Sequence, residues 1–218
     1  MHYRMREGLS WCTSEGRPVF LDLASDRYFR LRPEDERAFQ IWARSEATTG
    51  YEPAGLVRAG ILVACRAPEP PRPRTEVTMP TVDLGEESGG RAHPVAMLRA
   101  AIAQRRAAKA VRAGKLGALI AEIAREPSRS TARDGEGTAR RIAAAFASTP
   151  LSFRKAGQCV PRALAAHHLC RRHGVATRLI FGVRLEPFAA HCWLQFGQTV
   201  VVGDLEQARL FIPILAVP

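Results

Sequence analysis

Short apolar runs dominate the first part of the chain, and a helical pattern follows them. Three runs have the length of β-strands and are separated by turn residues: residues 9–12, 19–22 and 27–31. Pro33 then suits the first turn of a helix, whose apolar face is predicted to carry Phe39 and Trp42. Residues 53–59, ended by Gly60, predict a second helix, and a further strand is expected directly after it.

This order of three strands, two helices and a strand predicts a winged-helix-like domain over residues 1–66. Residues 67–94 interrupt the pattern, because their first half is dense in proline and their second half is rich in glycine. Prolines extend the backbone and glycines leave it flexible, so we predict a linker here. Within it, only residues 76–79 have the character of an edge strand.

The second half of the chain changes from helical to extended patterns. Alanine- and arginine-rich stretches predict helices, and the apolar runs after them predict strands. Helices are expected at residues 94–112, 116–125, 138–149 and 159–173, and strands at residues 176–183, 191–196 and 199–202. Helices followed by antiparallel strands predict an α+β domain over residues 95–218.

Composition narrows the classes of protein to consider. Apolar residues make up 46% of the 218 residues, enough for a buried core, and no apolar run reaches the roughly 20 residues of a membrane helix. Because the N-terminus also lacks the apolar core of a signal peptide, we expect a cytoplasmic protein without a membrane span. The net charge of +11 comes mostly from scattered arginines. Scattered charge does not predict specific nucleic-acid binding, although it leaves an anionic peptide or membrane surface open as a partner.

Cys159 has the surroundings of a reactive thiol. The five cysteines lack paired metal-ligand spacing, so neither a metal nor a cofactor is expected, and the other four are expected to be structural. Cys159 stands just before Pro161, at the predicted start of a helix. A helix N-terminus favours the thiolate and lowers the pKa of a cysteine, and its free N–H groups can stabilise an oxyanion. The side chain of Gln158 is a second candidate oxyanion donor.

Two later residues can complete a catalytic triad with this thiol. His191 follows Cys159 by 32 residues, at the expected start of a strand, and is the candidate general base. Asp204 follows the next expected strand and is the candidate residue that orients the imidazole. If the two strands pair through the turn between them, His191 and Asp204 become neighbours. A Cys, His, Asp order of this kind is typical of papain-like and transglutaminase-like enzymes.

With these residues in place, the C-terminal part resembles the lasso-peptide maturation protein B family, the leader peptidases of that biosynthetic system. The resemblance covers roughly residues 95–218. It rests on Cys159-Val160-Pro161-Arg162, on Gly182-Val183-Arg184 and on Ala190-His191-Cys192-Trp193. The family usually has Leu after the cysteine, Ala between the histidine and the tryptophan, and an Asn-Asp or similar pair at the third position. This chain has Val160, Cys192 and Gly203-Asp204 there, and the last departure makes Asp204 the least specific of the three matches.

The N-terminal part resembles the PqqD-like recognition element, which binds the leader of a ribosomally made precursor peptide. Residues 22–31 and the helix with Trp42 carry this resemblance. In that family the leader adds as an extra strand beside the third strand and packs on a following helix, so backbone hydrogen bonds supply affinity. The resemblance implies leader-binding side chains at Tyr28, Phe29, Arg30, Leu31, Leu56 and Val57, with Tyr28 or Phe29 as alternative core residues.

Together the two resemblances imply a recognition domain joined by a proline-rich linker to a papain- or transglutaminase-like cysteine peptidase. Such a protein would remove the leader of a lasso-peptide precursor. It would thereby free the core N-terminus for macrolactam formation by a partner cyclase, the asparagine-synthetase-like protein C. The chain has no G-x-x-x-x-G-K-[ST] loop, so the nucleotide chemistry is assigned to that partner.

Three other functions remain open from the sequence. The first is a leader-binding scaffold without catalysis. The second is a transglutaminase-like acyl transferase, which uses the same triad but passes the acyl group to an amine. The third is a winged-helix DNA-binding protein, whose recognition helix would include residues 54–58.

Overall fold

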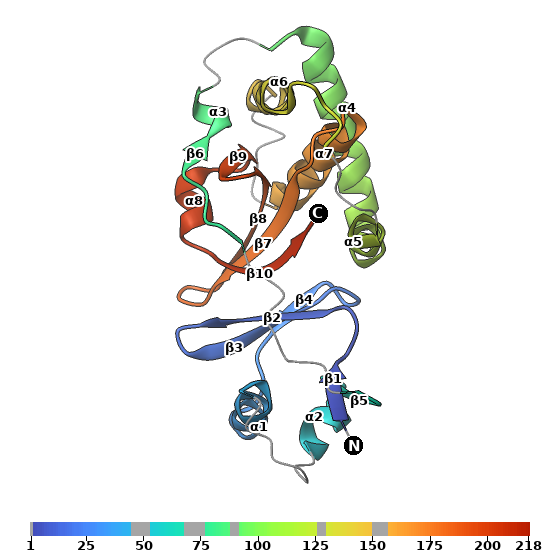
Figure 1. Ribbon diagram of the computed structural model, residues 1–218, viewed down its shortest axis with the longest axis vertical. Coiled ribbons are helices and arrows are strands. Elements are labelled where there is room, and N and C mark those ends of the chain that lie inside the picture. The colour runs from blue at the N-terminus through green and yellow to red at the C-terminus, as the bar shows by residue number, and fades with distance from the viewer. Residues whose placement is uncertain (1, 45–52, 68–76, 88–91, 126–129, 150–156) are drawn as a thin grey trace.

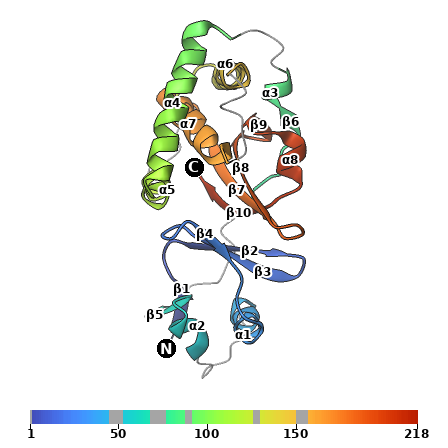
Figure 2. The same ribbon diagram turned by 180° about the vertical axis from the view of Figure 1, so that it is seen from behind.

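The fold consists of an N-terminal and a C-terminal unit, one beyond the other along the longest axis of the molecule (Figures 1 and 2). The computed structural model describes residues 2–44, 53–67, 77–87, 92–125, 130–149 and 157–218. Within this part of the chain the N-terminal unit ends at residue 67, and the C-terminal unit begins at residue 77.

A three-stranded antiparallel meander forms the centre of the N-terminal unit. Its strands, in sheet order, are β2 (Leu9–Ser14), β3 (Arg17–Asp22) and β4 (Arg27–Phe29). The turn between β2 and β3 consists of Glu15 and Gly16, whose φ angles of 53° and 75° match the twist of a tight hairpin. The two predicted helices are present as α1 (Pro33–Ala43) and α2 (Ala54–Arg58). The strand expected after the second helix is β5 (Leu62–Cys65), and it pairs with β1 (His2–Met5), which was not predicted.

The two faces of this meander pack against different partners, because neighbouring residues of a strand point to opposite sides. On one face, the Phe20 ring lies 5.2 Å from Phe29 and 4.8 Å from Phe39 of α1. On the other face, Val19 and Leu21 are buried in one continuous core with residues of the C-terminal unit. The N-terminal unit therefore shares part of its core with the rest of the molecule.

The C-terminal unit is built on a five-stranded sheet with the order β10-β7-β8-β9-β6. Neighbouring strands are antiparallel, except that β6 and β9 run parallel. The strands are β6 (Val82–Asp83), β7 (Arg178–Arg184), β8 (Ala189–Phe196), β9 (Thr199–Val202) and β10 (Ile212–Val217). The meander of the N-terminal unit lies beside β10 (Figure 1).

Helices cover both faces of this sheet. Helix α7 (Cys159–Arg172) packs in the main core, and α4 (Pro94–Arg112), α5 (Leu116–Arg125) and α6 (Gly135–Ala147) lie around it (Figure 2). The short α8 (Leu205–Arg209) packs in a second cluster with Ile180, Trp193 and Phe211, and α3 (Leu84–Glu87) follows β6 directly. Among the helices of the described residues, none combines the length and the apolar character needed to cross a membrane. The mixed α and β class expected from the sequence is thus confirmed.

Part of the predicted linker belongs to the C-terminal unit. The buried Asp83 carboxylate accepts hydrogen bonds from the backbone N–H of Gly85 (2.7 Å) and of Leu205 (2.9 Å). Gln195 Nε2 donates to the carbonyl oxygen of Thr78 at 2.7 Å. These contacts attach residues 77–87 to the C-terminal unit, which corrects the linker prediction for this stretch. The strand forms at Val82–Asp83, whereas residues 77–79 of the predicted edge strand are in no strand. The rest of the proline- and glycine-rich sequence, residues 68–76 and 88–91, lies outside the described residues.

The shared core makes a prediction about stability. Leu21 is 1% exposed in the core common to both units, so Leu21→Ala should lower the free energy of unfolding by about 2–5 kcal/mol. Val57→Ala is the control, because Val57 is 40% exposed and its truncation should change stability by less than about 0.5 kcal/mol. Urea denaturation measures both values. Equal small losses in the two variants would contradict burial of this face of the meander.

Candidate active site

Helix α7 begins at Cys159, as predicted, and a neighbouring helix holds this first turn in place. Pro161 is buried in the turn, where its missing N–H costs no hydrogen bond. The Arg162 guanidinium donates to the backbone oxygen of Phe146 (2.7 Å) and to Thr149 Oγ1 (3.1 Å) at the end of α6. It also lies 5.4 Å from the centre of the Phe146 ring. The Cys159 side chain is half-buried against the main core, so an accessible thiol stands at a fixed helix N-terminus.

The side chain of Gln158 is held by Gln104, a residue that the sequence analysis did not single out. Gln104 is 1% exposed, and its Nε2 donates to Gln158 Oε1 at 3.5 Å. This bond engages the carbonyl oxygen of Gln158 and leaves its amide nitrogen available as a donor. Ala100 and Ala108, one turn to either side of Gln104, are also buried. The only signal in the sequence was therefore one glutamine at the spacing of an apolar helix face.

His191 and Asp204 are electrostatic neighbours. Burial lowers the pKa of His191, and the Asp204 carboxylate offsets part of that effect. The imidazole stacks on Trp193, with ring centres 6.1 Å apart, and lies 5.4 Å from the ring of Phe211. Asp204 is the N-cap of α8 and accepts a hydrogen bond from the backbone N–H of Gln207 at 2.8 Å. Strands β8 and β9 pair as the sequence analysis assumed, and the role of Asp204 in orienting His191 stays a prediction.

Cys159 and His191 are not joined by a hydrogen bond. Within the described residues, His191 Nε2 is buried and has no hydrogen-bond partner. His191 contacts Trp193 and Phe211 of the second cluster, whereas Cys159 packs against the main core. Cys192 lies on the side of β8 that faces the main core, where Cys159 also packs. Burial raises the pKa of Cys192, and Cys159 raises it further. His191 therefore interacts electrostatically with Asp204, and no hydrogen bond joins it to the Cys159 thiol.

The residues predicted to bind a leader differ in their positions. Phe29 and Leu31 pack against the aromatic core of the N-terminal unit, and Arg30 is exposed. Leu56 has no exposed surface, which corrects its assignment to a leader groove, because a fully buried side chain cannot line a surface site. Val57 is exposed on α2.

Tyr28 is one of the two residues for which the sequence analysis named the core as the alternative to the leader groove, and it packs against the core that joins the two units. Its neighbour across the strand pair is Leu21, so it lies on the face of the meander that joins the C-terminal unit. Burial raises the pKa of Tyr28, and the nearby Cys192 and Cys159 raise it further.

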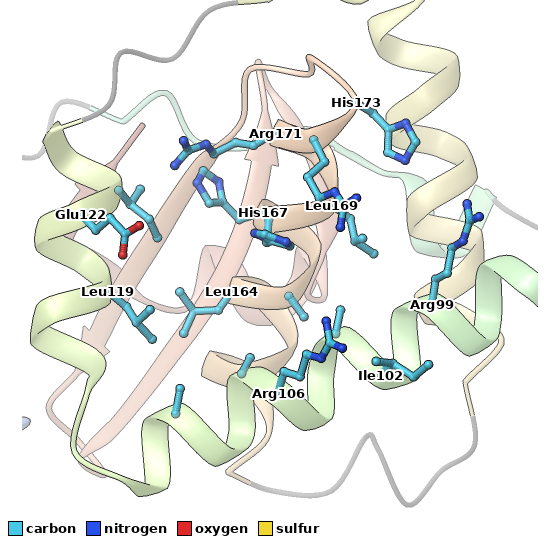
Figure 3. A pocket seen from close by; sticks show the side chains of 17 residues that line it. Arg99, Ile102, Arg106, Leu119, Glu122, Leu164, His167, Leu169, Arg171 and His173 are labelled. Atoms are coloured by element: carbon cyan, nitrogen blue, oxygen red, sulfur yellow. The ribbon is translucent and has the colours of Figure 1, made fainter.

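A groove of about 700 Å³ lies between α4, α5 and α7, on the outer helices (Figure 3). Apolar side chains line it together with arginines, histidines and one carboxylate: Arg99, Arg106, Glu122, His168, Arg171, Arg172 and His173. Buried His167, at its edge, makes a 3.1 Å hydrogen bond between Nδ1 and Thr177 Oγ1, and burial lowers its pKa to about 4. None of the predicted catalytic residues lines this groove. The described residues also contain no group of three or more His, Cys, Asp or Glu side chains that could hold a metal ion.

Comparison with known families agrees with the arrangement of the C-terminal unit. The family model described as the transglutaminase-like superfamily matches residues 92–216, more than half of the chain. No curated protein and no solved structure matches the chain. The family match covers helices α4 to α7 and strands β7 to β10, and it leaves the N-terminal unit and β6 outside. The chain belongs to the transglutaminase-like superfamily.

Proposed function

We propose that this protein is a cytoplasmic cysteine peptidase that removes the leader from a ribosomally made precursor peptide of the lasso type. The observation that carries the proposal is the position of Cys159, a half-buried thiol at the first residue of a helix in a transglutaminase-like domain. The superfamily includes cysteine peptidases and acyl transferases, and both use a thiol to form an acyl-enzyme.

The N-terminal unit supports a peptide substrate. Strand β4 is an edge strand of the meander, and in the described residues nothing pairs with its outer side. An open strand edge offers backbone groups to an added strand, which is the binding mode implied by the PqqD-like resemblance. The sequence motif and the unpaired edge of β4 thus support the proposed recognition element and linker. Binding to DNA through α2 is less well supported, because α2 has only five residues and Leu56 in it is buried.

In the proposed reaction, Cys159 Sγ attacks the carbonyl carbon between leader and core while His191 takes the thiol proton. Gln158 and the N–H groups at the start of α7 would stabilise the oxyanion. Collapse of the tetrahedral intermediate breaks the C–N bond, and His191 returns the proton to the departing amine. The core then leaves with a free α-amine, the leader remains as a thioester, and water hydrolyses it. The released core would pass to a partner cyclase.

The state of His191 suits a general base, but its contact with the thiol has to form during catalysis. Because burial lowers its pKa, the imidazole is neutral at neutral pH, which is the form that accepts a proton. Asp204 would favour the imidazolium that results. Hydrogen bonds between catalytic groups are often long or poorly aligned in a free enzyme and tighten when substrate binds. The proposal requires a larger change here, because His191 packs with Trp193 and Phe211 while Cys159 packs against the main core, so the imidazole has to move to the thiol.

The first test compares two cysteines of the same helix. Cys159→Ala should abolish cleavage of a precursor peptide identified among the neighbouring reading frames, because the nucleophile is lost. Cys170→Ala removes a thiol that is fully buried three turns away, and it should retain cleavage. Mass spectrometry of the products measures both variants, and it also separates hydrolysis from transfer to an amine. Cleavage by Cys159→Ala at the wild-type rate would exclude the peptidase mechanism.

The second test concerns Gln104 as a positioning residue. Gln104→Leu should lower kcat by about tenfold and leave KM unchanged, because Gln158 then loses the partner that orients it, whereas complete loss of an oxyanion donor costs about 10²–10³. Gln40→Leu is the matched control, since Gln40 lies in α1 of the N-terminal unit and donates to Gly16. If kcat and the melting temperature of Gln104→Leu both stay unchanged, Gln104 has no role in positioning the active-site residues.

A further inference from the structure

The groove between α4, α5 and α7 brings apolar and cationic side chains together away from the thiol (Figure 3). From α4 it is lined by residues 99, 102, 103, 106, 107 and 110, and this spacing of three and four positions belongs to one face of a helix. Alanines occupy three of these positions, and their small side chains leave space between the helices. A face of α4 thus borders an opening of about 700 Å³.

The charge along the groove is mostly positive. Among the described residues that line it are four arginines and one glutamate, which gives a balance of +3 when the histidines are neutral. Burial lowers the pKa of His168, and Arg172 of α7 and Arg106 of α4 lower it further. Two cations from different helices therefore act on the same place. A cleft lined by charges of one sign attracts ions of the opposite sign, so the groove favours an anion.

His167 contributes a polar atom without a partner to the groove. Its side chain is buried, and its Nδ1 shares a hydrogen bond of 3.1 Å with Thr177 Oγ1. In the part of the chain that the structure describes, Nε2 on the other side of the ring is buried and has no hydrogen-bond partner. In the tautomer in which Thr177 donates to Nδ1, Nε2 carries the hydrogen and can donate to an oxygen. A ligand oxygen there would remove the cost of an unsatisfied buried group.

The size of the groove decides between a small molecule and a protein partner. Pockets for small molecules usually measure about 300–1,000 Å³, and the volume of 700 Å³ lies inside this range. A stable protein interface involves roughly 20–30 residues on each side. Only 17 of the described residues line the groove, and several of them are buried core residues. The groove is therefore sized for one small molecule.

We propose that this groove binds a small anion with an apolar body, of the class of medium-chain carboxylates and alkyl phosphates. Its oxygens would accept hydrogen bonds from Arg106, Arg172 and His167, since a guanidinium matches both head groups. Its hydrocarbon chain would leave water and lie against Leu119 and Leu164. The site does not include the proposed catalytic residues, so it goes beyond the proposed function and does not depend on it.

Isothermal titration calorimetry of the full chain with four simple probes tests the site. Octanoate should bind at least about tenfold more tightly than octyltrimethylammonium, which has the same chain and the opposite charge. Octanoate should also bind about tenfold more tightly than hexanoate, because each buried CH₂ group strengthens binding by about fourfold. Octyl phosphate then identifies the preferred head group, and tighter binding of either anion supports the site.

Variants and one spectroscopic signal locate the bound anion. Arg106→Gln should weaken octanoate binding by about tenfold, whereas Arg112→Gln should leave it unchanged, because Arg112 is exposed on the same helix and does not line the groove. Ala103→Phe places a ring in the groove and should abolish binding. The imidazole ¹⁵N signals of His167 should shift when octanoate is added, and those of the exposed His2 in β1 should not.

Three results would overturn the site. The first is equal binding of octanoate and octyltrimethylammonium, and the second is unchanged octanoate binding in Arg106→Gln. The third is binding to phosphatidylglycerol vesicles without binding of octanoate, which would identify a membrane surface as the partner of these arginines. None of these measurements involves peptide cleavage or Cys159. Failure of the leader-peptidase proposal would leave them all unchanged, so the two failures are distinguishable.

Discussion

The close packing of α7 in the main core is the constraint on which the rest of the structure depends. The side chains that α7 buries there include Ala163, Ala166 and Cys170, none of which has exposed surface. Small side chains allow a helix to approach its neighbours closely, and a dense core then resists any shift of the helix along its axis. Because α7 is fixed, its first residue is fixed too. Arg162 adds a second restraint at this end of the helix through Phe146 and Thr149.

The same core joins the two units into one body. Leu21 and Val19 of the meander are buried with the strands of the C-terminal unit, and Tyr28 packs against the same core. A recognition unit on a flexible tether would raise only the local concentration of a bound peptide. A unit that packs beside the thiol can also orient the peptide, and positioning of the reacting groups contributes much of the barrier reduction in many enzymes. The arrangement therefore supports a substrate that contacts both units at once.

The parts of the fold that could be predicted from the sequence are those with a local physical signal. The start of α7 follows from the proline in its first turn and the glycine after its end, and the meander follows from its apolar runs and turns. Other features depend on contacts between residues far apart in the chain, which leave no periodic trace. Asp83 and Gln195 tie residues 77–87 to the sheet, and each acts through a single side chain.

In the candidate site, too, some features have a local signal in the sequence and others depend on contacts between distant residues. The sequence identified Cys159, Gln158, His191 and Asp204 through residue type and spacing, but it could not show which of them touch. Alternation along β8 places His191 with Trp193 and Phe211, and places Cys192 in the core of α7. Gln104 comes from a different helix than Gln158, so only the tertiary fold brings these two side chains together.

The most direct test of the central claim is the site at which a leader-directed electrophile reacts. A synthetic leader peptide that ends in a chloromethyl ketone would be mixed with the native protein, and the modified residue would be located by mass spectrometry. If Cys159 is the nucleophile and the N-terminal unit presents the leader to it, a single adduct forms on Cys159 and Cys65 remains unmodified. An adduct on Cys65 at an equal rate, or none on Cys159 while iodoacetamide still modifies it, would contradict the claim.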